Sequence, residues 1–133
     1  MRTIACTLVC LAALNCQAEE KRIDFNRDIR PLLSDNCFAC HGPEEKSREA
    51  GLRLDDRLSV FEELESGETA IVPGDLGASA LVDRITDSDE DFMMPPPDSG
   101  KILEPEEIEL LKQWIEQGAN WADHWSFVNP QRP

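Results

Sequence analysis

A cysteine pair and the histidine directly after it have the most specific spacing in this sequence. Cys37, Cys40 and His41 form the pattern Cys-x-x-Cys-His. Two intervening residues place both sulfur atoms on one side of a helical turn. In this pattern the two thiols can add across the vinyl groups of haem while the imidazole binds the iron. We therefore predict one covalently attached haem c, bound through Cys37 and Cys40, with His41 as a metal ligand.

Two adjacent methionines are candidates for a second iron ligand. Met93 and Met94 lie in the acidic, proline-rich stretch 86–100, where the prolines at 95–97 stiffen the backbone. A thioether opposite a histidine raises the reduction potential because it favours ferrous iron. His124 is an alternative ligand, which would give a bis-histidine haem, and its other role would be packing near the C-terminus. An exposed loop methionine without a ligand role remains an alternative for both methionines.

The first 18 residues have the pattern of a signal peptide. Arg2 precedes an apolar stretch from Ile4 to Leu14, and a small-residue cleavage pattern ends at Ala18. A membrane anchor is disfavoured because a spanning helix needs about 20 apolar residues. We predict cleavage after Ala18 and an exported protein, periplasmic or otherwise extracytoplasmic, with no membrane span after cleavage.

Other uses of the cysteine pair fit the sequence less well. Outside the predicted signal peptide, a zinc site could draw only on Cys37, Cys40, His41 and the distant His124, whereas structural zinc usually needs four ligands. A thioredoxin-like redox pair would require a βαβ context that the sequence does not show. Three of the five cysteines lie in the signal peptide, so a scaffold held by several disulfides is also disfavoured.

The chain is strongly acidic, with a formal net charge of -14. This charge disfavours nucleic acid and anionic membrane surfaces as partners. It favours solubility, or steering toward a basic redox partner protein that the sequence does not identify. Arg53 is a candidate for neutralising a haem propionate, and a solvated loop arginine is the commoner case.

The length of 133 residues suits one domain with one core. The apolar spacing and the positions of proline and glycine predict helices and loops rather than a sheet. The predicted segments are a helix from near Pro31 into the cysteine pair, a loop at 42–57, a short helix at 57–65, an extended piece at 70–72, a short helix at 79–85, a loop at 86–100 and a helix at 105–117. The predicted core residues are Phe25, Ile29, Leu111 and Trp114.

These residues together resemble the planctomycete-type cytochrome c domain, a relative of class I cytochromes c, from about Phe25 to Phe127. The matching pieces are Ile29-Arg30-Pro31, Cys-x-x-Cys-His-Gly at 37–42, Gly51-Leu52-Arg53-Leu54-Asp55, Ile71-Val72-Pro73-Gly74-Asp75, Met94-Pro95-Pro96, Glu107-Ile108 through Trp114-Ile115, Gly118-Ala119 and His124-Trp125. In the wider cytochrome c family the methionine directly before a proline is the distal ligand. The resemblance therefore implies Met94 as the second metal ligand, although the Met93-Met94 doublet departs from the pattern.

The resemblance also implies a fold and a domain organisation. We expect a small all-α cytochrome c-like domain with short helices and long loops around one haem, in which the helix at 105–117 packs against the helix leading into Cys37. The predicted organisation is a signal peptide at 1–18, the haem domain at 19–127 and a C-terminal tail at 128–133. Because family members often continue into large domains, we expect either a free-standing carrier or a part of a longer protein in which this tail is a linker.

The function that we expect is one-electron transfer outside the cytoplasm, without enzymatic activity of the chain itself. One alternative is a haem-containing enzyme or ligand-binding domain with an open distal site. Others are a redox module of a larger multidomain protein and a binding module without haem.

Overall fold

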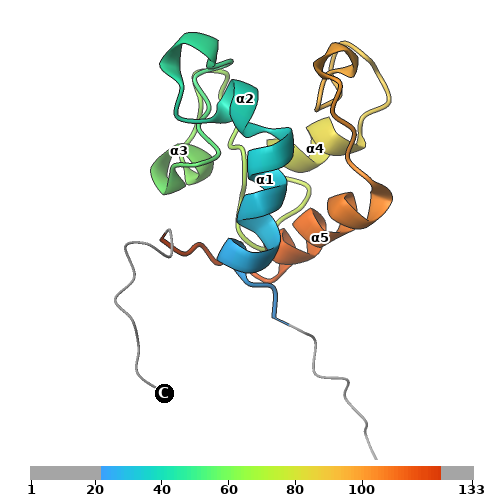
Figure 1. Cartoon of the computed structure of the whole chain (residues 1–133). Helices are drawn as coiled ribbons and strands as arrows, with labels where there is room; N and C mark the ends of the chain where they lie inside the picture. The colour runs from blue at the N-terminus through green and yellow to red at the C-terminus, as the bar shows by residue number, and fades with distance from the viewer. Residues whose placement is uncertain (1–21, 124–133) are drawn as a thin grey trace, which may run out of the picture.

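The computed structural model describes residues 22–123, and the structural statements below concern this part of the chain. The predicted signal peptide, His124 and the predicted tail lie outside the described residues. Short helices joined by long loops make up the described part (Figure 1). None of these helices is long and apolar enough to cross a membrane.

The described residues form an all-α fold, which confirms the predicted fold class. The helices are α1 (Arg30–Asn36), α2 (Phe38–His41), α3 (Arg57–Phe61), α4 (Ala80–Thr86) and α5 (Pro105–Glu116), with a π-helical turn at Phe25–Ile29 and 3-10 turns at Glu45–Ser47 and Pro97–Ser99. Extended backbone pairs only in isolated bridges, Glu63 with Thr69 and Val72 with Asp75. The piece predicted to be extended at 70–72 therefore does not belong to a sheet in the described region.

The segment before the cysteine pair is helical, as predicted, but it has three parts. The π-helical turn Phe25–Ile29 was not predicted, and α1 follows it with Pro31 in its first turn, where a missing N–H costs no hydrogen bond. At Cys37 the backbone leaves helical geometry (φ -124°), and α2 begins at the next residue. The N–H of Cys37 still donates to the carbonyl of Leu33 (2.8 Å between N and O), so the cysteine pair is held directly on the end of α1.

Helix α5 provides the base of the core. It begins at Pro105 as predicted, and the side chain of Glu107 accepts a hydrogen bond from the N–H of Glu104 (2.9 Å). Leu111, Trp114 and Ile115 on its inner face are fully buried. It packs against α4 and against the π-helical turn at the start of the segment leading into Cys37 (Figure 1). The predicted helix packing therefore occurs through this first turn.

An aromatic cluster joins the two ends of the described chain. The ring of Phe25 lies 5.5 Å from that of Trp114 and 4.0 Å from that of Trp121, measured between centroids. Arg30 covers the Phe25 ring from 4.9 Å and donates to the carbonyl of Ala122 (3.1 Å). Because buried aromatic rings contribute large apolar area, this cluster fixes the N-terminal segment to the region after α5.

Helix α3 is shorter than predicted. The side chain of Asp56 accepts a hydrogen bond from the N–H of Leu58 (2.9 Å) and caps its start. Helix α3 ends at Phe61 because the backbone is already extended at Glu62 (ψ 158°). The predicted helix at 57–65 is therefore wrong in its last turn. The chain instead folds back, so that the N–H of Ile71 donates to the carbonyl of Val60 (3.1 Å).

A buried serine determines where α4 begins. Ser79 is fully buried, and its hydroxyl oxygen accepts from the N–H of Val72 (2.9 Å) and donates to the carbonyl of Asp75 (2.6 Å). One hydroxyl therefore satisfies both ends of the turn that precedes α4. This turn matters for the site below because α4 contributes several residues to it.

We predict that Ser79→Ala lowers the free energy of unfolding by about 1–3 kcal/mol, because it leaves the buried N–H of Val72 without a partner. Ser47→Ala is the matched control, since the Ser47 hydroxyl is exposed and makes one long hydrogen bond (3.5 Å). Denaturant titration of the purified protein measures both variants. Equal stabilities of the two variants would contradict the role given to Ser79.

Candidate haem-binding site

One cavity brings together four of the residues that the sequence singled out. Cys37, Cys40, His41 and Met94 all line a cavity of about 340 Å³. This volume lies in the range of about 300–1,000 Å³ typical of small-molecule and cofactor sites. The cysteines and the histidine come from α2 and its start, and Met94 comes from the loop between α4 and α5, at the same end of the molecule (Figure 1).

The wall of this cavity is largely apolar and continues into the hydrophobic core. Leu54, Leu81, Ile85 and Leu103 belong to both. An apolar wall suits a flat porphyrin, whose faces are hydrophobic, and it keeps water away from a bound metal. Two cationic residues, Arg84 and Lys101, and two acidic ones, Glu49 and Glu68, also line it. The cavity therefore has the composition that a haem needs.

The two cysteines are free thiols and are both half-buried. The pKa of Cys37 is raised to about 12, mainly by burial and then by the neighbouring Cys40. The Cys37 side chain is therefore a neutral thiol at neutral pH. No group of three or more histidine, cysteine or acidic side chains that could hold a metal ion occurs in residues 22–123, so a zinc site at the cysteine pair gains no support there.

His41 has the properties of a histidine prepared for a metal. Its Nδ1 atom is buried and makes no hydrogen bond within the described residues. Burial is the largest influence on its pKa and lowers it, against smaller opposing effects from the backbone and the charge of Glu49 and from the backbone of Leu52. The imidazole is therefore neutral at neutral pH and keeps a lone pair for a metal. A ring with an unpartnered nitrogen in an apolar cavity fits a residue whose partner is the iron of a haem.

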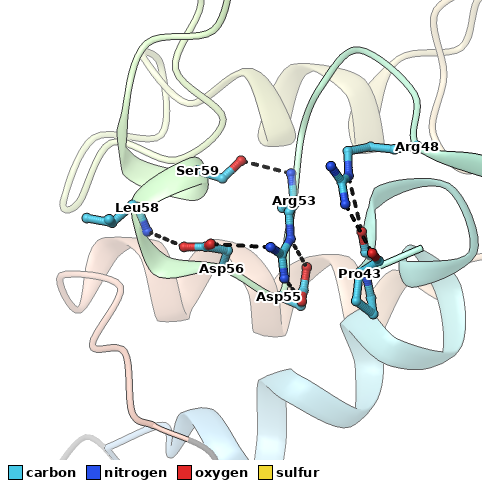
Figure 2. A network of polar contacts seen from close by, with 8 residues as sticks. Pro43, Arg48, Arg53, Asp55, Asp56, Leu58 and Ser59 are labelled. Atoms are coloured by element: carbon cyan, nitrogen blue, oxygen red, sulfur yellow. Dashed lines mark hydrogen bonds and ion pairs between the residues drawn. The ribbon is translucent and has the colours of Figure 1, made fainter. Parts of the chain in front are cut away.

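The loop after the motif is folded back over α2. The N–H of Glu49 donates to the carbonyl of Cys40 (2.8 Å), and the N–H of Leu54 donates to the carbonyl of His41 (2.7 Å). Arg48 donates to the carbonyl of Pro43 (3.1 Å), as Figure 2 shows. The predicted loop at 42–57 thus supplies the hydrogen bonds that the end of α2 cannot make within itself.

Arg53 does not have the role considered for it. Its guanidinium pairs with Asp55 (2.6 Å between Nη2 and Oδ2) and lies 3.6 Å from a carboxylate oxygen of Asp56 (Figure 2). Arg53 is also not among the residues that line the cavity. Arg53 stabilises the turn before α3. Arg84 and Lys101 replace it as candidates for pairing with a haem propionate, and the sequence analysis did not identify them. The signal for Arg84 was helical spacing, since it follows the buried Leu81 by three residues. Lys101 lies in a loop and had no such signal.

The structure distinguishes the two methionines by position. Met94 lines the cavity, and Met93 is not among its lining residues. The N–H of Met94 donates to the carbonyl of Arg84 in α4 (2.8 Å), whereas the N–H of Met93 turns back to Asp89 (2.7 Å). Of the two candidates, Met94 is the one that lines the same cavity as the cysteine pair and His41. His124, the alternative, lies outside the described residues.

Comparison with known proteins supports the resemblance to the cytochrome c family. Residues 37–98 match the family model described as Planctomycete cytochrome C. The matched segment begins at the first cysteine of the motif and includes Met94 and the prolines after it. The match confirms the resemblance inferred from the sequence. No curated protein and no solved structure matches the chain.

We predict that Gly42→Ala lowers the free energy of unfolding by about 1–3 kcal/mol, a typical cost of overpacking. A Cβ atom at Gly42 would lie 2.3 Å from the backbone oxygen of Phe38, so α2 would have to shift. The control is Gly77→Ala, whose added Cβ would meet only the Asp75 side chain at an ordinary 3.6 Å. Denaturant titration of both haem-loaded variants measures the difference. A Gly42→Ala protein as stable as the control would show that this close approach is unimportant.

Proposed function

We propose that this chain carries single electrons through one covalently attached haem c, because residues 37–98 match the family model described as Planctomycete cytochrome C. The observation that carries the proposal is the single cavity lined by Cys37, Cys40, His41 and Met94. When bound, haem supplies a one-electron couple at its iron.

Each of the four residues has a distinct task in this proposal. Cys37 and Cys40 anchor the porphyrin through thioether bonds, so that it stays in the protein in both redox states. His41 binds the iron from one side as a neutral imidazole, which its lowered pKa supports. Met94 binds from the other side with a soft thioether that favours ferrous iron and raises the potential. The apolar wall around them excludes water.

A closed distal side favours electron transfer over ligand chemistry. An enzyme or a ligand-binding haem protein would need an open position on the iron. Met94 lines the cavity and is held there through its own backbone, which favours six-coordinate iron. The protein then contributes no bond-making chemistry of its own.

We also propose that the chain acts outside the cytoplasm. This part of the proposal rests on the signal-peptide pattern of residues 1–18 and on the cytochrome c family match. The strongly negative net charge, -14 for the full sequence, suits an encounter with a redox protein that presents basic residues.

We predict that replacing both cysteines, Cys37→Ala with Cys40→Ala, abolishes covalent haem, because no thiol remains for attachment in the matured chain. The protein is produced with a cytochrome c maturation system, and its intact mass and haem stain are compared with those of the unaltered chain. The unaltered protein should carry the mass of one porphyrin. If it carries none after maturation, the proposed function fails.

The two methionines give a second test. Met94→Ala should remove the methionine-to-iron charge-transfer band from the ferric absorption spectrum and lower the reduction potential, while the haem stays attached. Met93→Ala is the matched control and should retain both properties, since Met93 does not line the cavity. If Met94→Ala keeps the band, Met93 is the ligand instead. If it keeps six-coordinate iron without that band, His124 becomes the candidate.

A further inference from the structure

We infer that Arg84 is a positioning residue for Met94. Its backbone carbonyl contacts Met94 and its side chain contacts Phe92. These two contacts hold the loop on both sides of Met93, so that Met94 faces the cavity. The inference rests on the proposed function, because it concerns how the chain presents its distal ligand.

The backbone contact connects the ligand residue directly to a helix. The carbonyl of Arg84, in the last turns of α4, accepts a hydrogen bond from the N–H of Met94 (2.8 Å). Helix α4 is itself fixed in the core by Leu81, Val82 and Ile85, which are all buried. The position of the Met94 backbone is therefore set by a packed helix and does not depend on the loop alone.

The side chain of Arg84 holds the other side of the doublet. Its Nη1 atom donates to the carbonyl of Phe92 (3.4 Å), and its guanidinium carbon lies 5.4 Å above the centre of the Phe92 ring. Phe92 is 51% exposed, so this contact lies at the surface of the domain. A cation over an aromatic face at an exposed site contributes about 0.5–1 kcal/mol. Arg84 thus contacts Phe92 and Met94, the residues on either side of Met93.

The loop before Met94 needs such support because its own hydrogen bonds are local. The N–H groups of Phe92 and Met93 both donate to the carbonyl of Asp89 (2.9 and 2.7 Å). The N–H of Asp91 donates to the Asp89 side chain (3.0 Å). These bonds close a turn without attaching it to the domain. The turn also carries four acidic side chains between 87 and 91, which repel one another.

This arrangement predicts a measurable effect on the ligand bond. If Met94 is held less firmly, a competing ligand displaces it from ferric iron more easily. Imidazole is a suitable probe because it is neutral, like the thioether that it replaces. The exchange leaves the charge at the iron unchanged, so the loss of the positive charge of Arg84 has little direct effect on the equilibrium. Losing a contact of about 0.5–1 kcal/mol corresponds to roughly two- to five-fold tighter imidazole binding.

The experiment titrates imidazole into the ferric haem-loaded protein and its variants. Arg84→Ala and Phe92→Ala should each bind imidazole roughly two- to five-fold more tightly than the unaltered protein. Arg57→Ala is the matched control: it removes the same charge and a similar contact, since the Arg57 guanidinium lies 5.7 Å from the ring centre of Phe61, but Arg57 does not line the cavity. It should leave imidazole binding unchanged. Equal affinities for Arg84→Ala and Arg57→Ala would overturn the inference.

Two further measurements separate this inference from the proposed function. Hydrogen exchange at the Met94 amide of the haem-loaded protein should be faster in Arg84→Ala than in Arg57→Ala, and equal rates would count against the inference. The ferric spectrum of the unaltered protein tests the premise. If it shows no methionine-to-iron band, the proposed distal ligation fails and the inference fails with it. If the band is present but the Arg84 variants behave as the control does, only the inference fails.

Discussion

The site depends on one short turn of helix that could not exist alone. A four-residue helix has almost no intrinsic stability in water, because the cost of forming its first turn is not repaid. In this chain α2 (Phe38–His41) is held at both ends by backbone hydrogen bonds from outside it: Cys37 to Leu33 in α1, and Leu54 to the carbonyl of His41. The spacing of both sulfur atoms and the imidazole follows from this support.

The sequence predicted the parts of the fold that local chemistry determines. The helix at α5 follows from Pro105, the acidic first turn and the apolar face around Trp114, so both its start and its buried side were predictable. Specific backbone and side-chain contacts decided what was missed. Helix α3 ends early because the chain folds back from Val60 to Ile71, and Arg53 is occupied by Asp55. Neither partner can be inferred from periodicity.

The choice between the two methionines shows the same limit within the site. Met93 and Met94 are adjacent in a loop and have the same sequence composition around them, so the residue pattern alone did not decide which one is the ligand. Only the resemblance favoured Met94. The structure adds a physical reason, since a carbonyl of α4 fixes the backbone of Met94 while Met93 turns toward Asp89. The family match includes this methionine and the cysteine motif, but it does not by itself assign a ligand.

The core and the cavity belong to one continuous cluster of apolar side chains, and its two ends have different roles. The aromatic rings of Phe25, Trp114 and Trp121 pack at the end near α5 and join the chain ends without contributing to the cavity. Leu54 and Ile85 belong to the same cluster but face the cavity. The aromatic end therefore supplies stability that does not depend on haem, while the cavity end is the part that the proposed haem would fill. The loop that carries Met94 is attached to this cluster through α4, because the carbonyl of Arg84 accepts a hydrogen bond from the N–H of Met94.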